Sequence, residues 1–344
     1  MIRDARIGRI GTVALCAALA LLLAASCVAA VTFGAARVPA GIVWDVILSG
    51  IGDGEAGASP AQRNIVWELR LPRVLLSAVA GAGLAAVGAV LQVVTRNPLA
   101  DPYLFGVSAG ASVGAVAVLL YTGPVLGAVT LPMAAFLGAL AAMLFVFAAA
   151  RGRDGASSSE RLVLTGVATA FILHALTNFL IVGTTERGAE TALFWMMGGF
   201  GNARWSFVPL PALLTLAGIG WLILRSGVTN ALALGDDAAR TLGVDPARLR
   251  IELFAVTALM TGAIVSVSGG IGFVGLVLPH ILRMVVGGNL RALLPVAALS
   301  GGLFMVWVDV LARTALAPRE IPLGIVTSLF GGAFFLWLMR RRSV

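Results

Sequence analysis

Two arginines stand close together in Arg70-Leu71-Pro72-Arg73, directly before a long apolar run. A guanidinium group is a planar fork that binds a carboxylate through two parallel hydrogen bonds. Such groups at the edge of an apolar segment suit the recognition of acidic groups on a partner. The alternative is that both side chains only extend from the membrane into interfacial water. A third arginine, Arg313, has Asp309 one helical turn earlier, and these two could pair with each other.

Two histidines lie within apolar segments, His174 in the middle of one run and His280 after a proline in another. An ionisable group inside a membrane span is a functional candidate, and haem ligation is one such role. We favour a structural hydrogen bond for both. Residues 106–110 fit the pattern G-x-S-x-G of serine hydrolases, but that pattern needs a strand–turn–helix corner. Here it opens an apolar helix, so we expect no catalytic residue, no metal site and no bound cofactor.

A polar segment at Asn230–Arg250, NALALGDDAARTLGVDPARLR, separates two apolar runs. Asp236 and Arg240 have the i,i+4 spacing of a helical ion pair, and acidic residues lead the first turn. Gly243 suits a helix C-terminus. The segment therefore predicts a short amphipathic helix at Asp236–Leu242 that lies outside the membrane. A solvated connecting loop is the alternative.

The segment GTTERGAETALFWMMGGFGNAR, at Gly183–Arg204, predicts a short helix at Thr191–Gly198 that re-enters the membrane or lies flat on it. Methionine and aromatic side chains would give a polarisable lining to a large planar ligand, and packing is the equal alternative. Arg187 could face the carboxylates of such a ligand, or pair with a neighbouring glutamate. The candidate path residues are Arg187, Trp195, Met196, Met197 and Phe200.

Composition excludes a soluble protein. The chain has 344 residues, of which 59% are hydrophobic and only 12% charged, and its mean hydropathy is +1.00. Soluble domains carry about a quarter charged residues. All 24 basic residues are arginine, and a nucleotide-binding P-loop needs a lysine, so any ATP and Mg²⁺ must bind another chain. The arginines lie between apolar spans rather than in one stripe, so we expect no nucleic-acid partner despite the net charge of +8.

The apolar runs predict an all-α polytopic membrane protein, a single transmembrane domain over residues 1–344 that contacts membrane lipid. The first run, Ile10–Phe33, exceeds the usual signal-peptide core, so we interpret it as a transmembrane helix. Small residues recur on one face of the second and third runs, which predicts a close-packed helix hairpin around the turn at 95–102. The ten predicted spans are Ile10–Phe33, Leu71–Val94, Tyr103–Leu120, Val125–Ala150, Leu162–Val182, Phe207–Leu224, Ile251–Val267, Phe273–Val286, Ala292–Ala312 and Leu323–Met339.

Arginine distribution sets the predicted topology. With the N-terminus in the cytoplasm, 16 of the 24 arginines lie on the cytoplasmic side, in agreement with the positive-inside rule. Ten spans then place both termini in the cytoplasm. Ala35–Glu68 becomes an extracytoplasmic loop, with an interfacial helix around Ile42–Leu48.

Several motifs in order resemble one family. The chain carries LRLPR, G-A-x-L-A-x-x-G-A-x-L-Q, NPLADP and L-F-G-V-S-x-G-A between residues 69 and 111. It also carries L-A-L-G-x-x-x-A-x-x-L-G at 232–243 and G-L-x-x-P-H-I-x-R at 275–283. These resemble the permease subunit of type II ABC importers for iron–siderophore complexes, haem and cobalamin. The resemblance runs from Arg37 onward. It implies a fold of ten transmembrane helices and a homodimer in the bacterial inner membrane.

The resemblance also implies roles for particular residues. It makes Arg70, Arg73 and Arg313 the contacts for a periplasmic substrate-binding protein. It makes the turn Asn97-Pro98-Leu99 one cytoplasmic gate and Ser159-Glu160 the other, although Glu160 departs from the small polar residue common there. The segment near 230–250 would dock on two ATP-binding cassette subunits, through Leu234, Gly235, Asp236, Asp237, Arg240, Leu242 and Gly243.

The chain is therefore expected to be the permease of an ATP-driven importer rather than an enzyme. Its cargo is expected to be an iron chelate, with haem slightly ahead of a ferric siderophore because of Arg187 and the Met/Trp cluster, and cobalamin as the alternative. A secondary transporter is the rival class, but such proteins place carboxylates near the membrane midplane. Here the 16 acidic residues lie almost wholly in loops or at helix ends, with Asp309 the nearest exception. A scaffold or receptor without transport is a third class.

Overall fold

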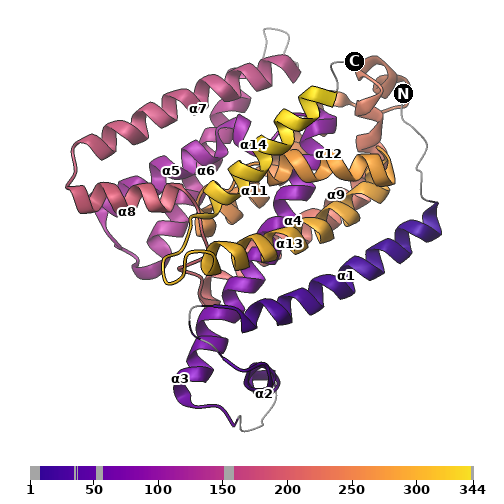
Figure 1. Ribbon diagram of the computed structural model, residues 1–344. Coiled ribbons are helices and arrows are strands. Elements are labelled where there is room, and N and C mark those ends of the chain that lie inside the picture. The colour runs from indigo at the N-terminus through magenta and orange to yellow at the C-terminus, as the bar shows by residue number, and fades with distance from the viewer. Residues whose placement is uncertain (1–7, 35, 37, 52–56, 151–158, 342–344) are drawn as a thin grey trace.

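The computed structural model describes residues 8–34, 36, 38–51, 57–150 and 159–341, and this part of the chain is helical, with turns and no strand (Figure 1). The long helices run through one bundle, and α2 and α3 stand at one end of it. The principal helices are α1 (Arg9–Thr32), α2 (Ala40–Ile51), α3 (Pro60–Arg63), α4 (Leu71–Val94), α5 (Val107–Ala117), α6 (Thr130–Ala150), α7 (Ser159–Val182), α8 (Glu186–Met196), α9 (Pro209–Ala233), α10 (Asp236–Thr241), α11 (Pro246–Ser268), α12 (Val274–Val286), α13 (Leu290–Thr314) and α14 (Leu323–Arg341).

Seven helical stretches in the described residues are long and apolar enough to cross a membrane, which supports the predicted all-α membrane class. They contain α1, α4, α6, α7, α9, α11 and α13. Three further predicted spans correspond to shorter apolar helices at Val107–Thr122, Val274–Val286 and Leu323–Trp337. The total of ten crossings therefore stays a prediction. A helix also forms where the sequence predicts one around Ile42–Leu48, as the longer α2, and its position at the membrane interface stays a prediction.

Helix α4 is the centre of the bundle, and its bounds are those that the sequence predicts. It packs on α13, α9, α12 and α11, and most of its side chains are buried. Its glycines permit this: a Cβ on Gly81 would overlap the carbonyl of Gly301 in α13, and one on Gly88 would overlap the carbonyl of Gly275 in α12. Small residues thus let three backbones approach closely.

The predicted hairpin of α4 against the next segment is wrong. The glycines of α5 face α6 instead, because a Cβ on Gly110 would overlap the carbonyl of Gly138, and one on Gly114 that of Ala134. The connection explains the change of partner. It holds a short 3₁₀ helix, η2 (Pro102–Phe105), which Asp101 caps and which ends at Gly106 in a left-handed conformation (φ 73°). The chain is thereby redirected, and α11 contacts both α4 and α5.

Candidate translocation, gating and docking sites

Helix α10 begins directly after Gly235, which has a φ of 113°, a backbone conformation that glycine adopts readily and other residues rarely adopt. Its first residue, Asp236, accepts hydrogen bonds from Nη1 and Nη2 of Arg250, at 2.8 Å and 2.7 Å. Arg96 also pairs with Asp236. These contacts join α10 to α11 and to the turn after α4. The hydrogen bonds from Arg250 hold the pKa of Asp236 below its usual value.

The ion pair expected between Asp236 and Arg240 does not form. Arg240 pairs with Asp237 at 3.1 Å instead, because Arg250 and Arg96 already occupy both oxygens of Asp236. The helix ends at Thr241, one residue before the predicted end.

Two apolar side chains flank α10 in the sequence and face solvent. Leu234 and Leu242, before and after the helix, are 56% and 63% exposed, whereas Ala239 within the helix is buried. Gly243 follows with a φ of 77°. Exposed leucines beside a charged helix fit a surface that another protein covers.

The predicted gate turn at Asn97–Leu99 is tightly folded. The amide of Leu99 donates to Oδ1 of Asn97 at 2.9 Å, and Arg96 adopts a positive φ of 50°. Asp101 follows and accepts from the amide of Tyr103 at 2.9 Å, while its other carboxylate oxygen is buried without a hydrogen-bond partner among the described residues. Burial raises the pKa of Asp101 to about 6. The other predicted gate, Ser159-Glu160, begins α7, and its side chains lie outside the described residues.

The three predicted docking arginines are all buried and all engaged within the chain. Arg73 contacts Asp309 at 2.9 Å through Nε and Glu320 at 2.7 Å through Nη1. Arg313 lies 3.4 Å from Asp309, so the alternative pairing foreseen for it exists. Arg70 donates to the carbonyl of Val31 at 3.0 Å and to that of Ala36. Docking through these arginines stays a prediction.

Helix α8 differs from the predicted helix at Thr191–Gly198. It starts five residues earlier because Thr185 caps it, accepting from the amide of Gly188 at 3.3 Å, and it ends at Met196 before Gly198, where φ is 75°. Arg187 is exposed on its first turn.

Two cavities flank the end of α8. A cavity of about 460 Å³ is lined by Met196 and Met197, and a second of about 830 Å³ by Trp195. Phe200 lines neither, because it is buried in the core beside Leu76 and Leu84. The residues proposed as one lining are therefore divided among three environments.

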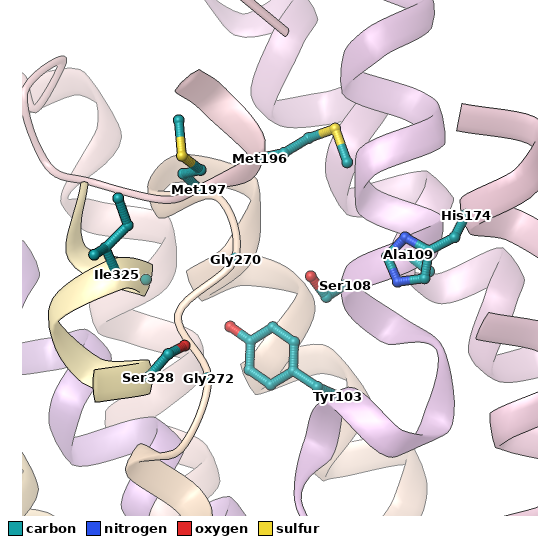
Figure 2. Close-up of a pocket in the computed structure, with 11 residues that line it drawn as sticks. Tyr103, Ser108, Ala109, His174, Met196, Met197, Gly270, Gly272, Ile325 and Ser328 are labelled. Atoms are coloured by element: carbon teal, nitrogen blue, oxygen red, sulfur yellow. The ribbon is translucent and has the colours of Figure 1, made fainter. Parts of the chain in front are cut away.

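The smaller cavity gathers residues from six parts of the chain, and Figure 2 shows them around it. His174 reaches it from α7 and is exposed. Its expected hydrogen bond does not form with any residue that the structure describes. The ring of His280 packs against that of Phe334, with centroids 6.5 Å apart. The cavity is lined by Tyr103, Ser108, Ala109, His174, Met196, Met197, Gly270, Gly272, Gly324, Ile325 and Ser328.

Sequence reasoning missed three contact residues: Arg250, Glu320 and Gln92. The amide of Gln92 donates to the carbonyl of Gly275 at 3.1 Å and accepts from Arg283 at 2.7 Å, which fixes α4 to α12. A polar residue inside an otherwise apolar run was the available signal for Gln92.

The profile of the FecCD transport family matches residues 19–341. The chain belongs to this family. Among its relatives, this FecCD protein is 44% identical over 288 residues to the cobalamin import system permease BtuC of Halobacterium salinarum (84% of this chain, 76% of that one). It is 41% identical to the hemin transport system permease HmuU of Yersinia pestis (80% and 84% covered) and 39% to the Fe(3+)-citrate import system permease YfmD of Bacillus subtilis (81% and 82%).

A solved structure agrees with this assignment. It is described as an inward-facing conformation of a metal-chelate type ABC transporter, and it matches with a TM-score of 0.81 and 30% identity. The match covers 95% of this chain and 98% of the other. The FecCD chain is thus a multi-pass membrane permease with the fold of an ABC transporter permease, as the sequence resemblance predicts.

Proposed function

We propose that this FecCD chain is the permease subunit of an ATP-driven importer that carries a metal chelate into the cytoplasm. Two copies would form the channel in the inner membrane, two ATP-binding cassette subunits would bind α10, and a loaded periplasmic binding protein would dock outside. The observation that carries the proposal is the position of Asp236. It lies on α10 and is held by Arg250 and by Arg96, which is next to the gate turn.

These contacts supply a route from nucleotide hydrolysis to the gate. A partner that moves α10 also moves Asp236, and Asp236 pulls on the turn through Arg96. Leu234 and Leu242 supply exposed apolar surface for that partner. The permease makes and breaks no covalent bond in this scheme. It offers different contacts in two states, and the ATPase changes their populations.

An iron chelate is the proposed cargo, with haem ahead of a ferric siderophore. The methionines beside a cavity support a planar, polarisable ligand. Cobalamin is the second candidate, because relatives over 40% identical are cobalamin permeases. Purifying the binding protein encoded beside the permease and identifying the coloured ligand that it retains tests the cargo directly.

Charge reversal on α10 tests the coupling. In proteoliposomes that contain the permease and its ATPase, Asp237→Arg with Arg240→Glu should abolish both uptake and the stimulation of ATP hydrolysis by the loaded binding protein. Asp45→Arg, on the exposed face of α2, is the control and should leave both intact. Unchanged uptake in the α10 variant would refute the proposal. Uptake driven by an ion gradient without the ATPase would favour a secondary transporter instead, and no ATPase stimulation by the wild type would favour a receptor.

A further inference from the structure

The 460 Å³ cavity lies where several helices are interrupted. Helix α5 starts beside it after the left-handed Gly106, α8 ends at it, and α14 begins at it. The connection between α11 and α12, which contains Gly270 and Gly272, crosses it as non-helical backbone (Figure 2). Interrupted helices inside a membrane are tolerated where they line a cavity, and transporters bind their cargo at such places.

Close backbone packing holds this cavity in shape. A Cβ on Gly270 would lie 3.0 Å from the carbonyl oxygen of Met196 and 3.2 Å from Oγ of Ser108, so only glycine fits without displacement. The hydroxyl of Tyr103 accepts a hydrogen bond of 2.7 Å from the amide of Ile271, which fixes the aromatic ring against the same connection. The cavity wall is therefore largely preformed.

His174 and Met196 supply the side chains of this wall that can ligate a metal. His174 lies within the apolar helix α7, is exposed, and forms no hydrogen bond or ion pair with the described residues. An ionisable side chain in that setting faces an aqueous path or a ligand. In Figure 2 its imidazole lies beside Ala109, and the thioether of Met196 extends toward the same side. Imidazole and thioether are the side chains that bind the axial positions of haem iron.

We propose that His174 is a transient axial ligand for a metal held in a planar nitrogen macrocycle, a haem or a corrinoid, as it passes this cavity. The inference rests on the proposed function and narrows its cargo. The imidazole lone pair would occupy an open axial position or displace one water from it, and no electron is transferred. The Tyr103 ring and the Met196 thioether would contact an edge of the macrocycle. A ferric siderophore that fills all six iron positions offers no such site.

Absorption spectroscopy tests the inference on the purified permease in lipid nanodiscs. Ferric haem and aquacobalamin are titrated separately, and the visible bands report imidazole at the metal. The wild type should show the spectrum of the imidazole-ligated metal with ferric haem, with aquacobalamin or with both. The macrocycle that gives this spectrum identifies the class of cargo. His174→Ala should lose it, with affinity lower by about tenfold or more, since even the outer partners of metal ligands contribute that much.

The second histidine is the matched control. His280→Ala should keep the ligated spectrum, because His280 packs on Phe334 away from this cavity lining. Free imidazole, at a concentration that leaves the spectrum of the macrocycle in empty nanodiscs unchanged, should restore the bands with His174→Ala, which shows that a lost ligand and not a lost fold is responsible. A ferric hexadentate hydroxamate should give no change with any variant. Equal spectra for wild type and His174→Ala, or no ligated spectrum in wild type, would overturn the inference.

A separate measurement keeps this inference distinct from the proposed function. The stimulation of ATP hydrolysis by loaded binding protein is recorded for the wild type and for His174→Ala. If loaded binding protein stimulates ATP hydrolysis by the wild type but His174 does not ligate the metal, the axial-ligand proposal is refuted and the importer proposal is supported. If His174 ligates the metal but no stimulation occurs, the importer proposal is refuted and the binding-site proposal is supported.

Discussion

Arg250 binds Asp236 through both terminal nitrogens of its guanidinium group, at 2.8 Å and 2.7 Å. The arginine side chain is only 4% exposed, whereas that of the aspartate is 32% exposed, so the pair joins the interior of α11 to the surface helix α10. Arg96 approaches the same carboxylate from the turn after α4. One carboxylate therefore connects α10, α11 and the turn after α4.

Removing the charge of Asp236 should uncouple these segments. Asp236→Asn leaves the buried guanidinium of Arg250 without a countercharge and weakens the contact with Arg96, so we expect the free energy of unfolding to fall by about 1–3 kcal/mol. In proteoliposomes, ATP hydrolysis should continue while uptake per ATP falls. The measurement is the ratio of cargo imported to phosphate released.

Glu252→Gln is the matched control, since Glu252 lies on α11 with Arg250 and pairs with Arg225 of α9 and with Arg248. Such partly exposed pairs contribute about 0–1 kcal/mol. An equal loss of the uptake ratio in both variants would contradict a specific role for Asp236.

The sequence predicted α10 and its charged first turn, but not the partner of Asp236. Local spacing favours the residue one turn ahead, and the sequence contains Arg240 at that position. Arg250 is 14 residues away, and it reaches Asp236 only because the chain turns back after Gly243. Pairings of this kind depend on loop geometry, which the pattern of apolar residues does not determine.

Asp309 and Glu320 should differ sharply when neutralised, although both contact Arg73. Asp309 is fully buried between Arg73 and Arg313, so Asp309→Asn takes the countercharge from the buried guanidinium of Arg313, leaves Arg73 with Glu320 alone, and should cost about 3–5 kcal/mol. Glu320 is 48% exposed, and Glu320→Gln should cost about 0–1 kcal/mol. Thermal unfolding in one detergent measures both. Equal midpoints would contradict this account.

The same substitution tests the predicted docking surface. Glu320 occupies Nη1 and Nη2 of Arg73, the atoms that a binding-protein carboxylate would need. If docking uses Arg73, Glu320→Gln should strengthen binding of the loaded binding protein by up to about fivefold, which corresponds to ~1 kcal/mol. Arg73→Gln in the Glu320→Gln background should abolish that gain. A gain that persists without Arg73 would exclude this arginine from docking.

Because of Asp101, the free energy of unfolding should fall as the pH rises. Burial raises the pKa of this carboxyl from 3.8 to about 6, so the folded chain binds the proton more tightly than the unfolded chain. The contribution is complete below pH 4 and is lost as the pH rises through 6, by about 3 kcal/mol at most. Asp101→Asn keeps the acceptor for the Tyr103 amide and should remove this part of the pH dependence.

Unfolding midpoints between pH 4 and 8 check this expectation. Asp45→Asn is the control, because it removes a carboxylate from the exposed face of α2. If Asp101→Asn and the wild type lose stability in parallel over that range, the buried carboxyl is not the titrating group.

The bounds of α4 were predictable because a long apolar run lies between a proline near its start and a polar turn at its end. The partners of its small residues were not. Gly81 and Gly110 show the same spacing pattern, yet one meets α13 and the other α6. A face of small residues predicts that another helix packs closely against it. The path of the connecting turn determines which helix that is. The cavity beside His174 could not be predicted from the sequence for the same reason, since its lining comes from six separate segments.

Close approach at Gly81 gives a direct test of this packing. A Cβ there would overlap the carbonyl of Gly301 and the side chain of Met305, so Gly81→Ala forces α4 and α13 apart and should cost about 1–3 kcal/mol. Gly220, on α9, has open space where a Cβ would lie, so Gly220→Ala should be neutral or stabilise by up to about 1 kcal/mol. Unfolding midpoints in the same detergent compare them. Identical midpoints would mean that α4 and α13 are not held by backbone contact, and the central position of α4 would lose its physical basis.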